Sequence, residues 1–258
     1  MKIIENDPTQ DMAQPGVIVS AIRAGGTFLS HCLSNHPHVY CDRGEPLHHR
    51  SAWCSLFEGD RRALLRVLLN QTGYRVSMCK LTYVQAFHRD IWPELQELQP
   101  RVIWLRRENV IRQAVSVAIN QRARAGQLDR PQHTFEAQTV PVAIEIGAGE
   151  FLRYVDGLVR RNVAAQGKLR LMSNVLVLSY EEITANPTHL YMAQGLNPDA
   201  ADRICEFLGV PFALMPADLA RVNPWPLSEL LTNWHEIRQA IGESQYAALA
   251  EKELHWTS

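Results

Sequence analysis

Gly16-Val17-Ile18-Val19-Ser20-Ala21-Ile22-Arg23-Ala24-Gly25-Gly26-Thr27-Phe28-Leu29 is the stretch from which the rest of the chain can be oriented. The β-branched run at residues 17–19 is typical of a buried strand. After a loop of small residues, Phe28, Leu29, Cys32 and Leu33 recur at the spacing of one helical face. The stretch therefore predicts a strand, a loop large enough to hold a phosphate group, and the start of a helix.

The loop follows the phosphate-binding pattern G-x-x-x-x-G-K-[ST] without its lysine. Ser20 occupies the position of the first glycine and Gly25 that of the second. Gly26 occupies the position of the lysine, and Thr27 that of the hydroxyl residue. Backbone N–H groups at a helix start still bind an anion, and Arg23 supplies a cation from inside the loop. Loss of the lysine disfavours ATP or GTP hydrolysis. The motif alone leaves open a plain strand-to-helix turn.

Length and charge bound the class of protein. The 258 residues suit a single domain, 1–258, with residues 1–15 as an N-terminal extension and no Ser/Gly/Pro-rich linker. A net charge of −1 gives no general attraction for nucleic acid or anionic membrane. Residues 1–15 lack the layout of a secretory signal, and no window of about 18 uncharged apolar residues follows. We expect a cytoplasmic protein without a membrane span.

Cysteine usage agrees with a reducing compartment. The chain has five cysteines, an odd number without a C-x-x-C pair: Cys32, Cys41, Cys54, Cys79 and Cys205. Several histidines lie near the first three of these cysteines in the sequence, so a zinc site is the alternative to free thiols. No C-x-x-C or H-x-x-x-H ligand pair stands out, and we expect no metal.

Strand-like and helix-like segments alternate along the chain. Strands are expected near residues 17–19, 39–41, 74–81, 102–105 and 175–178, and helices near 61–69, 90–98, 110–124, 151–171, 200–208, 230–240 and 244–254. The strands are apolar runs rather than alternating patterns, which is typical of a parallel sheet covered on both faces. The pattern predicts an α/β fold: a P-loop NTPase-like parallel β-sheet flanked by helices on both faces. Residues 125–149 lack periodicity and are interpreted as a substrate-facing flap.

Polar side chains follow the expected second strand. Glu45, His48 and His49 lie in a loop there, and loops at strand ends carry chemistry in parallel sheets. The alternative is that Glu45 forms a surface ion pair with Arg43 or Arg50.

Positively charged residues lie at the carboxyl ends of the expected third and fourth strands. Lys80 lies near the end of the third strand, where it points either into the mouth of the sheet or into solvent. Arg106 and Arg107 follow the fourth strand, where a nucleotide hydrolase would carry a magnesium-binding aspartate. The site is therefore expected to bind an anion. Ser116, on the following helix, could face the same anion as Arg107, or solvent.

Several segments, taken in order, resemble the sulfotransferases that use 3′-phosphoadenosine 5′-phosphosulfate (PAPS). They are Arg23 to Leu29, Asn35-His36-Pro37, Gly44-Glu45-Pro46-Leu47, Val102 to Arg107 with Ser116, Leu178 to Glu182 with Asn186-Pro187, and Phe207 to Pro211. The resemblance spans about residues 16–240. It is strongest to bacterial carbohydrate sulfotransferases that sulfate trehalose or nodulation factors, which share Cys79-Lys80, the spacing from Arg107 to Ser116, and Asn233-Trp234-His235-Glu236.

The resemblance implies a role for each matching residue. The 5′-phosphosulfate loop would be Ser20, Arg23, Ala24, Gly25, Gly26, Thr27 and Phe28, and the 3′-phosphate would be held by Arg107 and Ser116. Glu45 matches the proposed general base. Apart from the resemblance, His48 or His49 is the second candidate for taking the proton of the acceptor hydroxyl. Arg23, assisted by Lys80, would neutralise the oxygen that leaves with the nucleotide. Ala24-Gly25-Gly26 departs from the usual Ser-Gly-Ser/Thr and removes a hydroxyl that could steady the donor.

The implied activity is transfer of a sulfuryl group from PAPS to an acceptor hydroxyl on a carbohydrate or glycolipid, with adenosine 3′,5′-bisphosphate as product and no metal. Two alternatives stay open. A P-loop small-molecule kinase would need a Walker lysine and an acidic strand end, and the sequence has neither. A catalytically silent nucleotide-binding or scaffold protein would have the same fold. The sequence does not identify the acceptor and does not decide between a monomer and a homodimer.

Overall fold

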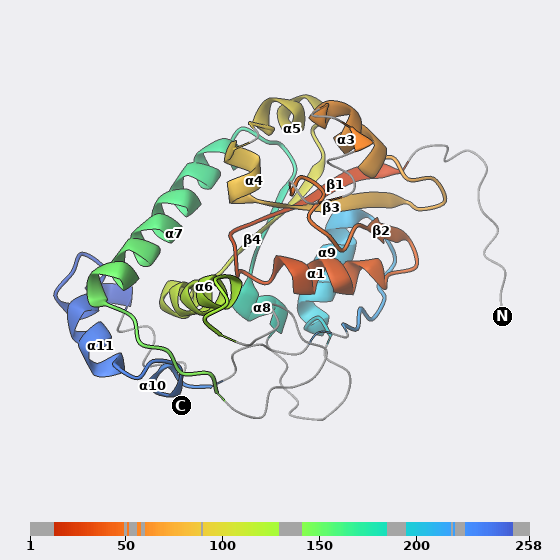
Figure 1. Cartoon of the computed structure of the whole chain (residues 1–258). Coiled ribbons are helices and arrows are strands. Elements are labelled where there is room, and N and C mark those ends of the chain that lie inside the picture. The colour runs from red at the N-terminus through yellow and green to blue at the C-terminus, as the bar shows by residue number, and fades with distance from the viewer. Residues whose placement is uncertain are drawn as a thin grey trace.

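The computed structural model describes residues 13–48, 51, 56–57, 60–88, 90–128, 141–184, 195–217, 219 and 225–249. In this part of the chain, a parallel sheet has the strand order β2-β3-β1-β4-β5 (Figure 1). The strands are β1 Gln14–Ser20, β2 Val39–Cys41, β3 Val76–Thr82, β4 Arg101–Arg106 and β5 Val175–Ser179. The predicted α/β fold class, with its P-loop NTPase-like sheet, is confirmed. Strand β1 begins inside the expected N-terminal extension, whose residues 1–12 lie outside the described ranges.

The apolar character of the strands follows from their burial on both faces. Val17, Ile18 and Val19 in the central strand β1 are fully buried. Ile18 pairs with Lys80 of β3 on one side and with Ile103 of β4 on the other. The chain runs from β1 out to the edge strand β2, returns through β3, and crosses β1 to reach β4. This reversal brings the carboxyl ends of β1, β3 and β4 together, which is where open α/β sheets bind ligands.

Helices cover each face of the sheet. Helices α1 (Gly26–Ser34) and α9 (Pro198–Leu208) pack on the face that carries Ile18 and Met78. Helices α3 (Arg61–Leu68), α4 (Tyr83–His88) and α5 (Trp92–Leu98), with the end of α7 (Ala148–Leu169), pack on the face of Val19 and Leu81. Figure 1 shows the two helical layers on opposite sides of the sheet.

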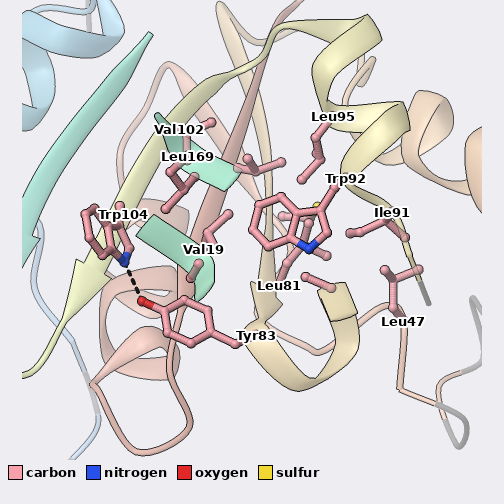
Figure 2. Packing of buried hydrophobic residues seen from close by; sticks show 14 of the residues in the cluster. Val19, Leu47, Leu81, Tyr83, Ile91, Trp92, Leu95, Val102, Trp104 and Leu169 are labelled. Atoms are coloured by element: carbon pink, nitrogen blue, oxygen red, sulfur yellow. Dashed lines mark hydrogen bonds between the residues drawn. The ribbon is translucent and has the colours of Figure 1, made fainter. Parts of the chain in front are cut away.

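The core on the second face contains a buried polar contact. The indole Nε1 of Trp104 donates a hydrogen bond to the hydroxyl of Tyr83 (Figure 2). Burial raises the pKa of Tyr83 to about 12, so its hydroxyl stays protonated. Tyr83 is the first residue of α4, and this contact therefore joins α4 to β4 through the core.

A third apolar cluster joins α6 (Val110–Arg124) and the start of α7 to α10 (Leu227–Leu230) and α11 (Trp234–Gly242). The helix expected near residues 230–240 is confirmed from Trp234 onward as α11, and its expected start is wrong. Leu231 leaves the helical path and bridges to Ile144, whose N–H donates to the carbonyl of Leu230. Helix α7 includes the last two residues of the expected flap, 148 and 149, and residues 129–140 of that flap lie outside the described ranges.

Two short helices, α4 and α8 (Tyr180–Thr184), had no counterpart in the sequence analysis. Of the helix expected over 244–254, residues 250–254 lie outside the described ranges. Within the described ranges, no helix combines the length and apolarity needed to cross a bilayer.

Candidate active site

The loop between β1 and α1 is shaped by a glycine with positive φ. Gly25 has φ +86°, and a Cβ atom there would lie 2.5 Å from the Tyr180 ring, so only glycine fits. Helix α1 starts without a side-chain cap and has no acidic residue in its first turn. The first N–H groups of a helix have no partner within the helix, so this end suits an anion.

Lys80 of β3 takes the place of the missing loop lysine. Its side chain is only 3% exposed, and its Nζ donates to Thr27 Oγ1 at 2.8 Å. A Cβ atom on Gly26 would lie 3.1 Å from Lys80 Cδ and 2.6 Å from Ser20 Oγ. The volume in which a side chain at position 26 would begin is thus occupied by Ser20 and by Lys80, which enters from the neighbouring strand. The alternative of a solvent-exposed Lys80 is wrong.

Glu45 lies beside this lysine. Its Oε1 is 3.4 Å from Lys80 Nζ, and its Oε2 accepts a hydrogen bond from Gln85 Nε2 at 3.0 Å. Glu45 is 38% exposed, so the carboxylate can reach both a buried cation and solvent. Burial lowers the pKa of Lys80, and the charge of Glu45 opposes that shift.

The alternative pairing of Glu45 with surface arginines finds no support in the described residues. Arg43 donates to Ser34 Oγ at 2.6 Å and to Asn35 Oδ1 at 3.0 Å. His48 lies in the same turn as Glu45, and its backbone N–H donates to the Glu45 carbonyl at 2.9 Å. His49 and Arg50 lie outside the described ranges.

On the other side of the loop, the structure brings Arg23, Arg107 and Ser116 together. Arg23 Nε donates to Ser116 Oγ at 3.0 Å, and Arg107 Nη1 donates to the Arg23 carbonyl at 3.2 Å. Ser116 is 6% exposed, so the alternative of a solvent-facing serine is wrong. The two sequence-predicted sites, one for each end of the nucleotide, are therefore neighbours.

Arg107 is held in place by two residues of α8, the short helix that directly follows β5. Its Nε lies 3.8 Å from Glu181 Oε1, and its guanidinium lies 4.5 Å from the centre of the Tyr180 ring. The Glu181 carboxylate also accepts hydrogen bonds from the N–H groups of Glu108 and Asn109. Tyr180 and Glu181 are site residues that were not predicted individually from the sequence. Their position directly after a buried strand was the signal available.

The loop thus has a cationic group on each side. Lys80, with Thr27 and Glu45, lies on the β3 side, and Arg23, with Arg107 and Ser116, lies on the α6 side. The remaining predicted loop residues are placed as follows: Ala24 is fully buried, and Phe28 packs against the core between α1 and the sheet. Among the described residues, no group of three or more His, Cys, Asp or Glu side chains is arranged to hold a metal ion. The arrangement suits a ligand with more than one anionic group.

Arg23 adopts a left-handed backbone conformation, with φ +59°, that costs a non-glycine residue about 1–2 kcal/mol. We expect Arg23→Gly to leave the melting temperature unchanged or raise it, because glycine adopts this conformation without strain. Affinity for adenosine 3′,5′-bisphosphate should fall at least about tenfold, since a charge-assisted hydrogen bond contributes roughly 1.5–3 kcal/mol. Thermal unfolding and calorimetric titration measure the two effects.

The matched control is Gln99→Gly. Gln99 is exposed, has φ +44°, and precedes the opposite end of β4. This variant should relieve similar strain and leave nucleotide affinity unchanged. Wild-type affinity in Arg23→Gly would show that the guanidinium does not bind the ligand.

Comparisons with known proteins bear on the fold. No family profile and no curated protein sequence matches the chain. A solved sulfotransferase from Alicyclobacillus acidocaldarius is 16% identical, over 94% of this chain and 96% of its own, with a TM-score of 0.54. The sulfotransferase domain from the curacin biosynthetic pathway is 14% identical, over 78% of this chain and 75% of its own, with a TM-score of 0.47. The first likeness shows that this chain shares the fold of a sulfotransferase.

Proposed function

We propose that this protein is a PAPS-dependent sulfotransferase that transfers a sulfuryl group to an acceptor hydroxyl on a carbohydrate or glycolipid. One observation carries the proposal: cationic groups lie on both sides of an anion-binding loop, and a carboxylate stands beside one of them. The fold shared with a solved sulfotransferase supports it. A nucleotide with phosphate at both the 3′ and 5′ positions has the charge distribution that this arrangement would recognise.

The donor would lie across the loop. Its 5′-phosphosulfate would accept hydrogen bonds from the first N–H groups of α1, close to Lys80 and Thr27. Its 3′-phosphate would be held by Arg107, Ser116 and Arg23, because planar guanidinium groups suit pairs of phosphate oxygens. Strand β4 ends in arginine rather than in a metal-binding carboxylate, which favours this donor over magnesium–ATP.

The transfer step needs a proton acceptor and a cation. The acceptor oxygen attacks sulfur, the bond from sulfur to the bridging oxygen breaks, and adenosine 3′,5′-bisphosphate leaves with that oxygen. Glu45 would take the hydroxyl proton, and a nearby cation would neutralise the charge that develops on the bridging oxygen. The sequence predicts Arg23, assisted by Lys80, as that cation. The contacts of Lys80 with both Thr27 and Glu45 favour Lys80, and those of Arg23 favour the 3′-phosphate.

Glu45→Gln tests the base. We expect turnover to fall by about 10²–10⁴-fold, because general-base catalysis typically contributes that much. Affinity for adenosine 3′,5′-bisphosphate should stay within about twofold, since the proton acceptor faces the acceptor hydroxyl rather than the nucleotide. Steady-state kinetics and calorimetry measure the two quantities. His48→Gln is measured alongside: a larger loss there than in Glu45→Gln would assign the base to His48.

The acceptor and the alternatives are tested together. Incubation with sulfur-labelled PAPS and a panel of sugars, glycolipids and phenols should label a sugar or glycolipid. Labelling from γ-phosphate-labelled ATP with magnesium would instead identify a kinase. Binding of adenosine 3′,5′-bisphosphate without transfer to any acceptor would identify a catalytically silent protein. The substrate-facing flap at residues 125–149 and the single-domain organisation also stay proposals. Limited proteolysis, with and without nucleotide, tests both: it shows whether cleavage falls within the flap and whether the rest of the chain resists cleavage as one unit.

A further inference from the structure

Thr82 and Gln85 form a capping box at the start of α4. The Thr82 N–H donates to Gln85 Oε1 at 3.0 Å, and the Gln85 N–H donates to Thr82 Oγ1 at 3.4 Å. This is the reciprocal pattern of a T-x-x-Q helix start. Because a backbone N–H can only donate, the amide oxygen of Gln85 must face Thr82 and its NH₂ group must face the opposite way.

That NH₂ group faces Glu45. Gln85 Nε2 donates to Glu45 Oε2 at 3.0 Å, and Gln85 is 8% exposed. The other carboxylate oxygen faces Lys80 Nζ at 3.4 Å. Glu45 belongs to a loop, whereas Lys80 and Gln85 belong to β3 and α4, which follow each other directly. A loop carboxylate is thus oriented by two donors on rigid elements.

We propose that Gln85 is a positioning residue, whose capped amide fixes the orientation of the Glu45 carboxylate toward the acceptor hydroxyl. The inference rests on the proposed function, in which Glu45 is the base. Each carboxylate oxygen has two lone pairs, so bonds to Gln85 and Lys80 leave sites that can accept a proton. Fixing a reacting group before the reaction removes an entropic cost from the barrier, and small misplacements lower the rate.

Two variants separate this role from helix capping. Gln85→Glu keeps an oxygen for the Thr82 N–H, loses the donor to Glu45, and places a second carboxylate beside it. Gln85→Met keeps the length of the side chain and loses both hydrogen bonds. Among the described residues, Lys80 of β3 is the charged group shown against the Glu45 carboxylate. The charged or titratable neighbours of Glu45 along its own loop are Asp42, Arg43 and His48. All four are the same in both variants.

For Gln85→Glu we expect kcat at neutral pH to fall about tenfold, and the acid limb of the pH–kcat profile to move up by about one pH unit, because two adjacent carboxylates resist ionising together. For Gln85→Met we expect a loss of about tenfold at every pH, with the acid limb unmoved. Affinity for adenosine 3′,5′-bisphosphate should stay within about twofold in both. The melting temperature of Gln85→Glu should lie below that of wild type at neutral pH, where the two carboxylates repel each other, and approach it at acid pH, where the repulsion is lost and the capping acceptor is kept.

A second readout does not need activity. In protein labelled with ¹³C at glutamate side chains, the Glu45 carboxyl resonance, assigned from its absence in Glu45→Gln, is titrated in wild type and in Gln85→Glu. A titration that moves to higher pH in Gln85→Glu supports the contact even if wild type transfers sulfuryl to no acceptor, in which case the proposed function fails alone. An unchanged titration together with a wild-type kcat would overturn the role of Gln85.

Discussion

Replacing Lys80 by methionine is expected to lower turnover by about 10²–10³-fold, the loss typical of removing a group that stabilises developing charge. Lys80 contacts both the loop, through Thr27, and the carboxylate of Glu45. In the Lys80→Met variant, the negative charge that develops on the bridging oxygen would no longer be neutralised by the cation on the β3 side of the loop. Steady-state kinetics with PAPS and a sugar acceptor measure the loss, and turnover near wild type would remove Lys80 from the mechanism.

The same variant should not lower stability. The substitution removes a buried charge whose desolvation opposes folding, and the Glu45 carboxylate, 38% exposed, stays hydrated without the lysine. Lys168→Met, on the exposed surface of α7, is the matched control and should change neither turnover nor stability. A large fall in the melting temperature of Lys80→Met would show that the lysine is structural.

The pH dependence of stability gives an independent check on Lys80. Burial lowers its pKa from the usual 10.5, so the unfolded chain binds the proton more tightly than the folded protein does. Keeping Lys80 charged therefore costs stability below the folded pKa. This cost is relieved as pH rises from the folded pKa toward 10.5, so the contribution of Lys80 to stability increases over that window. Thermal unfolding as a function of pH should show this increase in wild type and not in Lys80→Met.

Arg107→Ala is expected to weaken the binding of adenosine 3′,5′-bisphosphate by about 100-fold, since a bond between charged groups contributes roughly 1.5–3 kcal/mol and a guanidinium makes more than one. The variant should also be less stable, because Glu181, 10% exposed, loses the guanidinium beside it. Calorimetric titration gives the affinity and thermal unfolding gives the stability.

A double variant separates these two effects. Arg107→Ala combined with Glu181→Gln should recover part of the stability, because it removes the buried uncompensated charge, and should not recover nucleotide affinity. If affinity returns together with stability, Arg107 supports the loop and does not bind the 3′-phosphate.

The fold was largely predictable because its signals are local. Each of the five strands is a largely apolar run, and the loop before α1 matches a phosphate-binding motif at Gly25 and Thr27. Helix α4 was missed because six residues are too few to show a helical period. Its capping box, Thr82 to Gln85, was the overlooked signal. The break between α10 and α11 depends on the pairing of Leu231 with Ile144, which no local pattern contains.

The candidate site was predictable as a set of residues but not as a set of contacts. Arg23, Lys80 and Arg107 were identified because each follows or lies within a strand of a parallel sheet. Which of them meet depends on strand order and on which face each side chain takes. The contact of Arg23 with Ser116 joins residues far apart in the sequence. The contact of Lys80 with Glu45 depends on β2 and β3 being neighbours.

The most direct test of the account is equilibrium binding of three nucleotides to the wild-type protein: adenosine 3′,5′-bisphosphate, adenosine 5′-monophosphate and adenosine 3′-monophosphate. If the Lys80 side and the Arg107 side of the loop hold opposite ends of one nucleotide, the bisphosphate should bind about 100-fold more tightly than either monophosphate, since each loses one set of charged contacts. Equal affinity for the bisphosphate and the 5′-monophosphate would contradict the claim that the two sides of the loop hold opposite ends of one nucleotide.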